Sequence, residues 1–467
     1  MKIPNILKII SIQLAEQNAK AIIVGGSVRD HFLKLPSKDI DIEVYGLSSL
    51  EQLEKILSQY GSVNFVGKSF GVLKFVYKGM EYDFSFPRTE AKIAQGHRGF
   101  DVKIDGNLSF KEASKRRDFS MNALGYDIEA EQFLDPFDGL EDIKAKQLRH
   151  IDDVTFMEDP LRVYRAIQFC ARFDLTLDKE SFSLCNQMVE QGMLEELPKE
   201  RVYEEWEKLL LKAPKPSSGF ELMRELGILN YFPELYALID VPQSPKWHPE
   251  GNVWIHTLMG VDVMATLCRS QCMENDKQKL KFMFAILCHD LGKATHTTIE
   301  ESGRIRAIGH DVAGLELTKS LLYRLTNEYD FIESILPFVE HHLKPSLFYA
   351  NAAKDAAFRR LAMKVNIEEL VLVAKADFLG RTTKEALAGI YEAGIWMIEK
   401  AKCLEVKNTP LKPLIQGRDL IELGIEPSPK FKEILDVIYF EQLEGKVLKK
   451  DEALTFVKNY LNDMNRT

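Results

Sequence analysis

The spacing of hydrophobic residues divides the chain into two parts. Within the first 90 residues, apolar residues gather in short strand-length runs at 21–24, 62–66, 71–77 and 81–86, with turn residues between them. Helical spacing occurs in the first 17 residues and again over 48–60. From about Val154 onward the spacing becomes helical. The pattern therefore predicts an α+β fold, with a small mixed-sheet head followed by an all-α remainder.

The first of these strand-length runs leads into a candidate phosphate-binding turn. Gly25 and Gly26 allow a sharp turn and leave backbone amides free to face a phosphate. A helix beginning near Ser27 would add its N-terminal field. The next predicted strand carries Asp39 and Asp41, and strand residues two apart share a face. Two carboxylates beside a phosphate site can hold two divalent metals for phosphoryl-type transfer, whereas the alternative is an exposed acidic strand.

Further polar residues follow in the head. Asp83 alternates with apolar neighbours and is either a third carboxylate of this site or a surface acid. The polar, glycine-containing segment 88–115 is predicted to be a long loop. Arg116, Arg117 and Asp118 come next. They are either a solvated surface or, beside a phosphate site, contacts to a triphosphate and its ribose hydroxyls.

Together these motifs resemble the class II nucleotidyltransferase head, which CCA-adding tRNA nucleotidyltransferases and bacterial poly(A) polymerases share. The matching motifs are Gly-Gly-x-Val-Arg-Asp from Gly25, Lys-Asp-x-Asp ending at Asp41, and Arg-Arg-Asp-Phe-Ser-x-Asn-Ala from Arg116. The resemblance implies a polymerase-β-like head in which Asp39 and Asp41 are catalytic and hold Mg²⁺. The nucleotide-binding residues that it implies are Gly25, Gly26, Arg29, Arg116, Arg117, Asp118 and Asn122.

The first helical stretch after the head carries Glu158, Asp159, Arg162 and Arg165 on its polar side. Residue types alone favour a surface ion pair between Glu158 and Arg162, because residues four apart on a helix are neighbours. Asp159 and Arg162 also offer the acceptors and planar donors that recognition of a base edge requires. The stretch is similar to the family's Glu-Asp-x-x-Arg motif, which implies a protein template for incoming C or A, with Arg165 also binding the nucleotide. A motif at 197–204 resembles the helix that supports this template.

The histidines indicate a second site, since seven of the ten lie between His248 and His342. Imidazole and carboxylate ligands together suit Mn, Ni, Fe or Zn better than Mg alone. The spacing resembles an HD-domain metallophosphohydrolase, in which a metal activates water against a phosphate ester. The ligands that match are His256, His289, Asp290 and Asp377. The additional matching positions, which some HD proteins use for substrate or a second metal, are His310, His341 and His342.

Composition narrows the class of protein. A chain of 467 residues is expected to form three or four domains, and 45% apolar with 28% charged residues is typical of globular proteins. The net charge of −9 argues mildly against non-specific binding to nucleic acid but leaves room for a local basic surface. Six scattered cysteines and the lack of an apolar window of membrane length predict reduced thiols and a cytoplasmic location, with no membrane contact.

The resemblance extends over nearly the whole chain and predicts four regions. They are a nucleotidyltransferase head at 1–143, a helical neck or RNA-binding region at 144–245, an HD metallophosphohydrolase domain at 246–400 and a helical tail at 401–467. The predicted partners are tRNA, ATP and CTP, whereas the oligomeric state does not follow from the sequence. The predicted cofactors are Mg²⁺ in the head and a transition metal (Ni, Mn, Fe or Zn) or Mg²⁺ in the HD domain.

The predicted function is addition of CCA to the 3′ end of tRNA, together with phosphohydrolase activity on 2′,3′-cyclic phosphates and 2′-phosphates. One alternative is an enzyme that adds only CC or only A, or a poly(A) polymerase; segment 67–71 lacks the basic pair typical of the polymerase. An alternative of another class is an HD metallophosphohydrolase that uses the head as an RNA-binding module. Intact Asp39, Asp41 and Asp118 argue against it. An inactive HD fold and a purely helical scaffold complete the alternatives.

Overall fold

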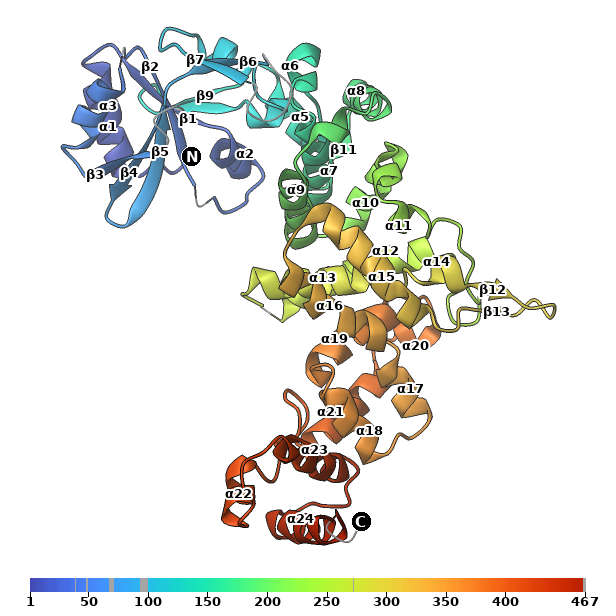
Figure 1. Cartoon of the computed structure of the whole chain (residues 1–467). Coiled ribbons are helices and arrows are strands. Elements are labelled where there is room, and N and C mark those ends of the chain that lie inside the picture. Colours follow the sequence, from blue (N-terminus) through green and yellow to red (C-terminus); the bar gives the residue numbers. More distant parts are fainter. Residues whose placement is uncertain (38, 48, 67–70, 93–99, 272, 465–467) are drawn as a thin grey trace. The chain divides into compact units, whose positions relative to one another are not determined.

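The computed structural model describes the chain except residues 38, 48, 67–70, 93–99, 272 and 465–467. It forms two compact units, Met1–Tyr231 and Phe232–Thr467, which are drawn in Figure 1 and treated separately below. Most of segment 67–71, which lacks the basic pair typical of poly(A) polymerases, lies outside the described residues.

The first unit begins with a mixed sheet, as predicted, and the structure gives this sheet seven strands. Its neighbours run antiparallel except for β2 and β5, which are parallel. In order across the sheet, the strands are β3 (Ser62–Val66), β4 (Val72–Tyr77), β5 (Met80–Ser85), β2 (Asp41–Tyr45), β1 (Lys20–Val24), β8 (Gly125–Asp127) and β9 (Gln132–Leu134).

Strand alternation separates the core of the head from its polar face. Helices α1 (Asn5–Ala15) and α3 (Leu50–Leu57) share one hydrophobic core with Ile42 and Val44 of β2. The intervening residues Asp41 and Glu43 therefore point to the other face, called the second face below. Because the period of a strand is two, a one-residue shift would exchange these faces, so the apolar residues fix where the acidic ones point.

The segment 88–115 is not the long loop that its polarity predicted. It contains the antiparallel strands β6 (Arg88–Lys92) and β7 (Phe100–Ile104), followed by the short helix α4 (Phe110–Ser114). Ser109 and Glu112 form a capping box at the start of α4. Strand β6 has Ala91 as its one apolar residue and gives no period-two signal, whereas β7 alternates apolar and polar residues and was overlooked within a polar, glycine-containing segment; Gly96 and Gly99 lie outside the described residues.

The remainder of the first unit is mostly helical. A break separates α6 from α7 where the sequence predicted one continuous helix, because Pro160 stands at the start of α7 and cannot continue the preceding backbone hydrogen bonds. A two-residue parallel pair, β10 (Gln147–Leu148) with β11 (Thr176–Leu177), was not predicted. The helices and turns are α2 (Gly26–Phe32), η1 (Ser120–Asn122), α5 (Gly139–Ala145), α6 (Asp153–Met157), α7 (Leu161–Phe173), α8 (Lys179–Glu190), η2 (Met193–Glu196), α9 (Lys199–Lys212), α10 (Pro216–Glu225) and η3 (Ile228–Tyr231).

Within its described residues, the second unit is helical apart from the hairpin of β12 (Thr298–Ile299) and β13 (Ile305–Arg306), which the all-α prediction did not include. Its helices begin with α11 (Pro233–Tyr236), α12 (Val253–Ser270), α13 (Asp276–Cys288), α14 (Lys293–His296), α15 (His310–Leu325), α16 (Tyr329–His341) and α17 (Lys344–Ala350). They continue with α18 (Asp355–Ala362), α19 (Ile367–Leu379), α20 (Lys384–Leu387), α21 (Glu392–Cys403), α22 (Gly417–Glu422), α23 (Lys430–Leu443) and α24 (Lys450–Met464).

Helices α12, α13, α16 and α19 pack on one another (Figure 1), and residues 282–288 of α13 are all buried. This is the reason that α13 reads as a continuous apolar run in the sequence. The last three helices share a separate small core that includes Leu420, Ile438 and Val457. Across the described residues, no helix combines the length and the apolar character that crossing a membrane requires.

Candidate functional sites

Three carboxylates gather where β2 begins. Asp41 lies opposite Asp83 in the parallel β2–β5 register, and the Asp83 N–H donates to the Ile40 carbonyl over 3.3 Å. Asp39 stands two residues earlier. The protein packed around Asp41, then the negative charge of Asp83 and of Asp39, raise the pKa of Asp41 above its ordinary value. Carboxylates that repel one another in this way fit a hard divalent cation such as Mg²⁺.

Glu43 is a further acid on the second face, to which the sequence analysis gave no role. Its carboxylate accepts hydrogen bonds from Arg116 (2.9 Å), Arg117 (3.0 Å) and the Tyr45 hydroxyl (2.7 Å). Burial would raise the pKa of Glu43, but the two guanidiniums hold it below its ordinary value. The signal that could have identified it is its place two residues after Asp41, on the same face of the strand.

A cavity of about 420 Å³ opens beside these residues in the head. It brings together every predicted nucleotide-binding residue. Of the two predicted catalytic carboxylates, Asp41 lines the cavity and Asp39 does not. Arg88 and Arg201 also line it, although neither was predicted to bind nucleotide. The complete lining is Gly25, Gly26, Arg29, Asp41, Arg88, Arg116, Arg117, Asp118, Asn122, Asp159, Leu161, Arg162, Arg165 and Arg201.

Position 25 requires glycine for two reasons, the backbone conformation of the turn and the close approach of another side chain. Gly25 has a φ of +70°, which L side chains rarely adopt, and a Cβ there would lie 2.9 Å from Nη1 of Arg117. Helix α2 starts at Gly26, one residue before the predicted start. Because Gly25 has no side chain, the guanidinium of Arg117 packs directly against its backbone at the wall of the cavity.

A buried network fixes several of the predicted residues relative to one another. Asn122 accepts from Arg29 (2.7 Å) and donates to Asp118 (2.9 Å), which also accepts from Arg165 at 2.6 and 2.7 Å. The Phe119 N–H donates to Asp118 as well, over 2.8 Å. Burial would raise the pKa of Asp118, but Arg165 and Asn122 hold it below its ordinary value. Since these contacts fill its main acceptor directions, a ribose hydroxyl would have to replace one of them.

The predicted template residues lie at the start of α7, yet they make different contacts from those expected of a surface ion pair. Arg162 donates to the carbonyls of Thr155 (2.7 Å) and Arg116 (2.5 Å), and the structure gives no ion pair between Arg162 and Glu158. The helix break at Pro160 removes the four-residue neighbour relation between them. Asp159 caps the Leu161 N–H and lies 3.5 Å from Arg201 on α9.

The second unit gathers the predicted HD residues into two groups that meet at Asp290. In the first group, Nε2 of His256 lies 3.0 Å from Asp377 and 3.7 Å from Oδ2 of Asp290. Nε2 of His289 lies 3.2 Å from the same Asp290 oxygen and 3.9 Å from Asp377. All four predicted ligands are buried and come from α12, the end of α13 and α19.

The second group uses the other oxygen of Asp290. Oδ1 lies 3.2 Å from Nε2 of His310 and 3.8 Å from Nε2 of His342, and the two imidazole nitrogens are 3.4 Å apart. His341, the third additional histidine of the sequence prediction, is not part of this group. It lies at the end of α16 with Nε2 3.7 Å from Glu340.

The donor set fits metal ions. His289, His310 and His342 each direct Nδ1 to a backbone carbonyl at 2.6–2.7 Å, which favours a proton on Nδ1. In His289 and His342 this leaves the Nε2 lone pair facing the carboxylates. Burial would lower the pKa of His310, but Asp290 raises it above its ordinary value. Burial lowers the pKa of His342 to about 3, so its imidazole is neutral near pH 7. Lone pairs that face carboxylate oxygens repel them unless a cation lies between, and the buried Nε2 of His289 has no hydrogen-bond donor.

Cationic side chains surround this centre. Lys293 contacts Oδ2 of Asp290 at 2.6 Å, and Nη2 of Arg381 contacts both oxygens of Asp377 at 2.7 and 2.8 Å. Burial would raise the pKa of Asp377, but Arg381 and His256 hold it well below its ordinary value. Lys293, Arg381 and Arg306 line a cavity of about 380 Å³ together with Asp290 and Asp377. A metal-binding cavity with this rim suits an anionic substrate.

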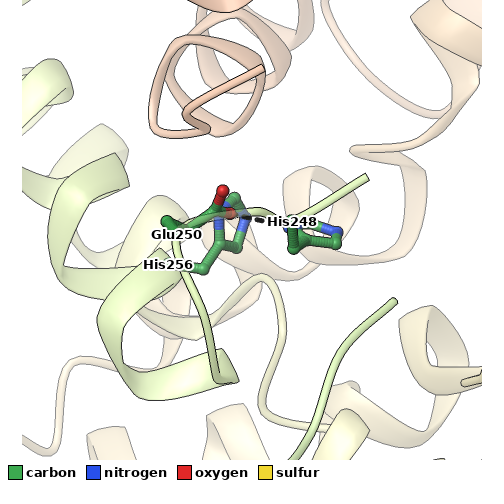
Figure 2. Close-up of side chains that lie close together, drawn as sticks. All are labelled: His248, Glu250 and His256. Atoms are coloured by element: carbon green, nitrogen blue, oxygen red, sulfur yellow. Dashed lines mark hydrogen bonds and ion pairs between the residues drawn. The ribbon is translucent and has the colours of Figure 1, made fainter. Parts of the chain in front are cut away.

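A third group of possible ligands is centred on Glu250, which lies in the segment before α12 (Figure 2). One oxygen of Glu250 lies 2.9 Å from Nδ1 of both His248 and His256. Burial would raise the pKa of Glu250, but these histidines hold it below its ordinary value. The sequence analysis noted this segment without giving Glu250 a role.

Comparison with known families assigns three regions of the chain. Residues 21–149 match the poly A polymerase head domain. Residues 174–238 match the family described as a probable RNA and SrmB binding site of polymerase A, and residues 253–381 match the HD domain. The order of head, RNA-binding region and HD domain is the order that the sequence motifs predicted.

Solved structures with the same fold include two CCA-adding enzymes of named origin. The enzyme from Bacillus stearothermophilus, in complex with CTP, is 22% identical with a TM-score of 0.65 and covers 100% of both chains. The enzyme from Thermotoga maritima, complexed with tRNA(CCA), is 22% identical with a TM-score of 0.60, covering 98% of this chain and 95% of that one. A further CCA-adding enzyme in an apo form is 21% identical with a TM-score of 0.66, covering 98% and 96%.

Proposed function

We propose that this chain, a class II nucleotidyltransferase with an RNA-binding region and an HD domain, adds CCA to the 3′ end of tRNA from CTP and ATP. The observation that carries the proposal is the head cavity. It is lined by Asp41, the glycine turn and Asp159, and by five arginines in addition to Arg88 and Arg201. The shared fold with CCA-adding enzymes supports it. We place this activity in the cytoplasm. We also keep the predicted domain limits at residues 143, 245 and 400.

The residues of the cavity have separate tasks in this proposal. Mg²⁺ held by Asp39 and Asp41 would lower the pKa of the tRNA 3′ hydroxyl and stabilise negative charge on the triphosphate. Arg29 and Arg117 bind the triphosphate beside the Gly25–Gly26 turn, because planar guanidiniums match phosphate oxygens. The 3′ oxygen attacks the α-phosphate, a new phosphodiester bond forms, and pyrophosphate leaves with the electrons of the bond that breaks.

Asp159 and Arg162 select the base in the same proposal. Arg162 is anchored at 2.5 and 2.7 Å by the two backbone carbonyls described above, so contact with a base exchanges one of these partners. Arg201 holds Asp159 from α9, which supports the role of that helix in positioning the template. Carboxylate and guanidinium edges together distinguish C and A from G and U by their donor and acceptor patterns.

Nucleotide incorporation tests the proposal against its alternatives. The protein is incubated with Mg²⁺, labelled CTP or ATP, and tRNA transcripts that end at the discriminator base, at C or at CC. We expect C on the first two transcripts and A on the third. Growth by C alone or by A alone identifies a CC-adding or A-adding enzyme, and a long A ladder identifies a poly(A) polymerase. Failure to incorporate any nucleotide overturns the proposal and leaves the head as an RNA-binding module.

We further propose that the HD domain hydrolyses 2′,3′-cyclic phosphates and 2′-phosphates. Two ligand groups that share Asp290 support it, since they would hold one metal each, and Ni, Mn, Fe or Zn suits their imidazole-rich donor sets. A bound metal would supply an activated water at neutral pH. Lys293 and Arg306 would hold the phosphate within the cavity. Release of phosphate from 2′-AMP, and ring opening of 2′,3′-cyclic AMP, are measured with each metal in turn. Loss of both in His289→Ala is expected, and wild-type inactivity with every metal overturns this part.

A further inference from the structure

Glu250 is a buried carboxylate beside the HD ligands that the proposed reactions leave without a task. Its side chain is 1% exposed, and Figure 2 draws it beside His248 and His256. Nδ1 of His256 is buried and lies 2.9 Å from an oxygen of Glu250, the nearest carboxylate, but the two atoms do not meet hydrogen-bond geometry as the ring is oriented here. On the opposite side of the ring, Nε2 of His256 faces Asp377 at 3.0 Å. The imidazole therefore stands between a candidate metal position and Glu250.

The other three histidines show why His256 needs such a partner. His289 and His342 end helices α13 and α16, and His310 begins α15. Carbonyls in the last turn of a helix lack intrahelical partners, and Nδ1 of His289 and of His342 each uses one of them, whereas Nδ1 of His310 uses the Ala307 carbonyl in the loop before α15. His256 lies within α12, where its own N–H bonds to the Asn252 carbonyl and the carbonyls that follow take part in the helix. A side chain must replace the backbone as acceptor.

Glu250 also connects two elements that carry ligands. Its second oxygen accepts the Thr382 N–H over 3.1 Å, just beyond the end of α19. The neighbouring residue Arg381 holds both oxygens of Asp377. The carboxylate of Glu250 therefore contacts the side chain of His256, the predicted ligand on α12. It also contacts the backbone shortly after Asp377, the predicted ligand on α19.

We propose that Glu250 is the positioning residue of the first HD metal group, accepting the Nδ1–H of His256 so that the Nε2 lone pair is presented to the metal. The inference rests on the proposed metal-dependent function of the HD domain. Carboxylates that hold the outer nitrogen of a metal-bound histidine fix its tautomer and ring orientation, and their loss typically weakens metal binding about 10- to 100-fold.

The competing interpretation is that His248, Glu250 and His256 form a metal site of their own, because their ligand atoms lie within 4.8 Å of one another. A neutral imidazole has one lone pair, so His256 serves either this group through Nδ1 or the HD group through Nε2. The HD group offers two carboxylates and a second histidine nitrogen to the same metal, which favours Nε2. His248 then acts only as a second donor to Glu250.

The test measures Ni²⁺ binding to the full chain by isothermal titration calorimetry, in a background of Asp41→Asn that weakens the carboxylate site of the head. We expect Glu250→Gln, which keeps the shape but loses the charge, to weaken one of the two bound Ni²⁺ ions about 10- to 100-fold and to leave the other within about 3-fold. Glu250→Ala is expected to weaken that ion further. The matched control is Glu340→Gln, another glutamate beside a histidine but outside the ligand groups, expected to bind as the background does. His248→Gln should change binding by less than about 3-fold.

Melting temperatures without metal separate positioning from folding. A positioning role predicts that Glu250→Gln reduces the rise in melting temperature that Ni²⁺ causes, while the metal-free melting temperature changes little. Equal Ni²⁺ binding by Glu250→Gln and the background overturns the inference and leaves the HD proposal intact. Loss of both ions with a lower metal-free melting temperature shows a structural role and overturns it too. Loss of the same ion in His248→Gln identifies the competing site, and absence of binding by the background with Ni²⁺, Mn²⁺, Fe²⁺ and Zn²⁺ in turn overturns both proposals.

Discussion

Asp41 and Glu43 are neighbouring acids on one strand face, but their surroundings give them opposite properties. Asp41 meets Asp83 and Asp39, which raise its pKa, whereas Glu43 meets two guanidiniums, which lower its pKa. The pair shows how much of the site the sequence predicts at the residue scale. Alternation on one strand placed both acids on one face, while the partners that set their charge come from distant segments. Asp83, which the sequence left open between catalytic and surface roles, is brought to Asp41 by the parallel β2–β5 pairing.

Replacing Asp41 by Asn should abolish nucleotide transfer while stabilising the metal-free protein. Loss of a metal ligand removes several kcal/mol of transition-state stabilisation, so the rate should fall about 1,000-fold or more. A raised folded-state pKa means that folding loses stability as pH rises from the ordinary value of 3.8 through the raised one. The variant escapes that loss, so its melting temperature without metal should exceed the wild-type value at pH 7, and the gap should narrow as pH falls. A lower melting temperature at pH 7 would contradict the account.

Replacing Glu43 by Gln should destabilise the head and weaken nucleotide binding. Two guanidiniums lose their common anion, and breaking a buried charge pair costs about 3 kcal/mol. Arg116 and Arg117 also lose the contact that orients them, so CTP should bind more weakly. Urea unfolding and CTP titration check both effects. Glu81→Gln is the control, since Glu81 pairs with Lys74 at 2.8 Å on the surface. A Glu43 variant as stable as the control would refute the assigned role.

At the scale of elements, apolar periodicity predicted well where it was strong. Strands β1 to β5 of the head sheet were expected within a few residues of their bounds, whereas β8 and β9 were not expected. The polar strand β6 gave no such signal, and the short alternation of β7 was overlooked, so both were expected as loop. Helices α6 and α7 were expected as one helical stretch despite Pro160. The glycine turn was expected from its residue types, yet the approach of Arg117 to Gly25 was not, since it depends on how segments 90 residues apart pack.

Replacing Gly25 by Ala should both strain the backbone and displace Arg117. The positive φ alone costs about 1–2 kcal/mol for an alanine. Gly79 is a matched control, because it has a φ of +78° and nothing within 4 Å of the added Cβ. Gly25→Ala should therefore lose more stability than Gly79→Ala and should also bind ATP more weakly. Thermal unfolding and ATP titration measure the two effects, and equal behaviour of the two variants would show that the Arg117 contact has no consequence.

At the scale of the whole molecule, the head carboxylates and the HD residues lie in separate compact units, and within the described residues the close groups of three or more possible metal ligands belong to the second unit. The sequence predicted both sets because their motifs are local, or are spaced along helices. It did not predict the sharing of Asp290 between two groups, which depends on how α13, α15 and α16 come together. The three predicted domain limits stay predictions, since the contacts divide the chain only between Tyr231 and Phe232.

Two separate sites predict two separable activities. Asp39→Ala should lose CCA addition by at least about 1,000-fold and retain phosphohydrolase activity, because the head carboxylates do not serve the second unit. His289→Ala should show the reverse. Both activities are assayed on the same preparations, with circular dichroism to verify folding. A folded variant that loses both activities would contradict the two-site account.

The length of the final tRNA product tests the central claim most directly. A tRNA transcript that ends at the discriminator base is incubated to completion with Mg²⁺, CTP and ATP, and the product is resolved at single-nucleotide length. If one cavity binds both nucleotides and Asp159 and Arg162 select between them, the product grows by three nucleotides, reads CCA and stops. A product that stops at another length, continues beyond CCA, or never extends would contradict the account.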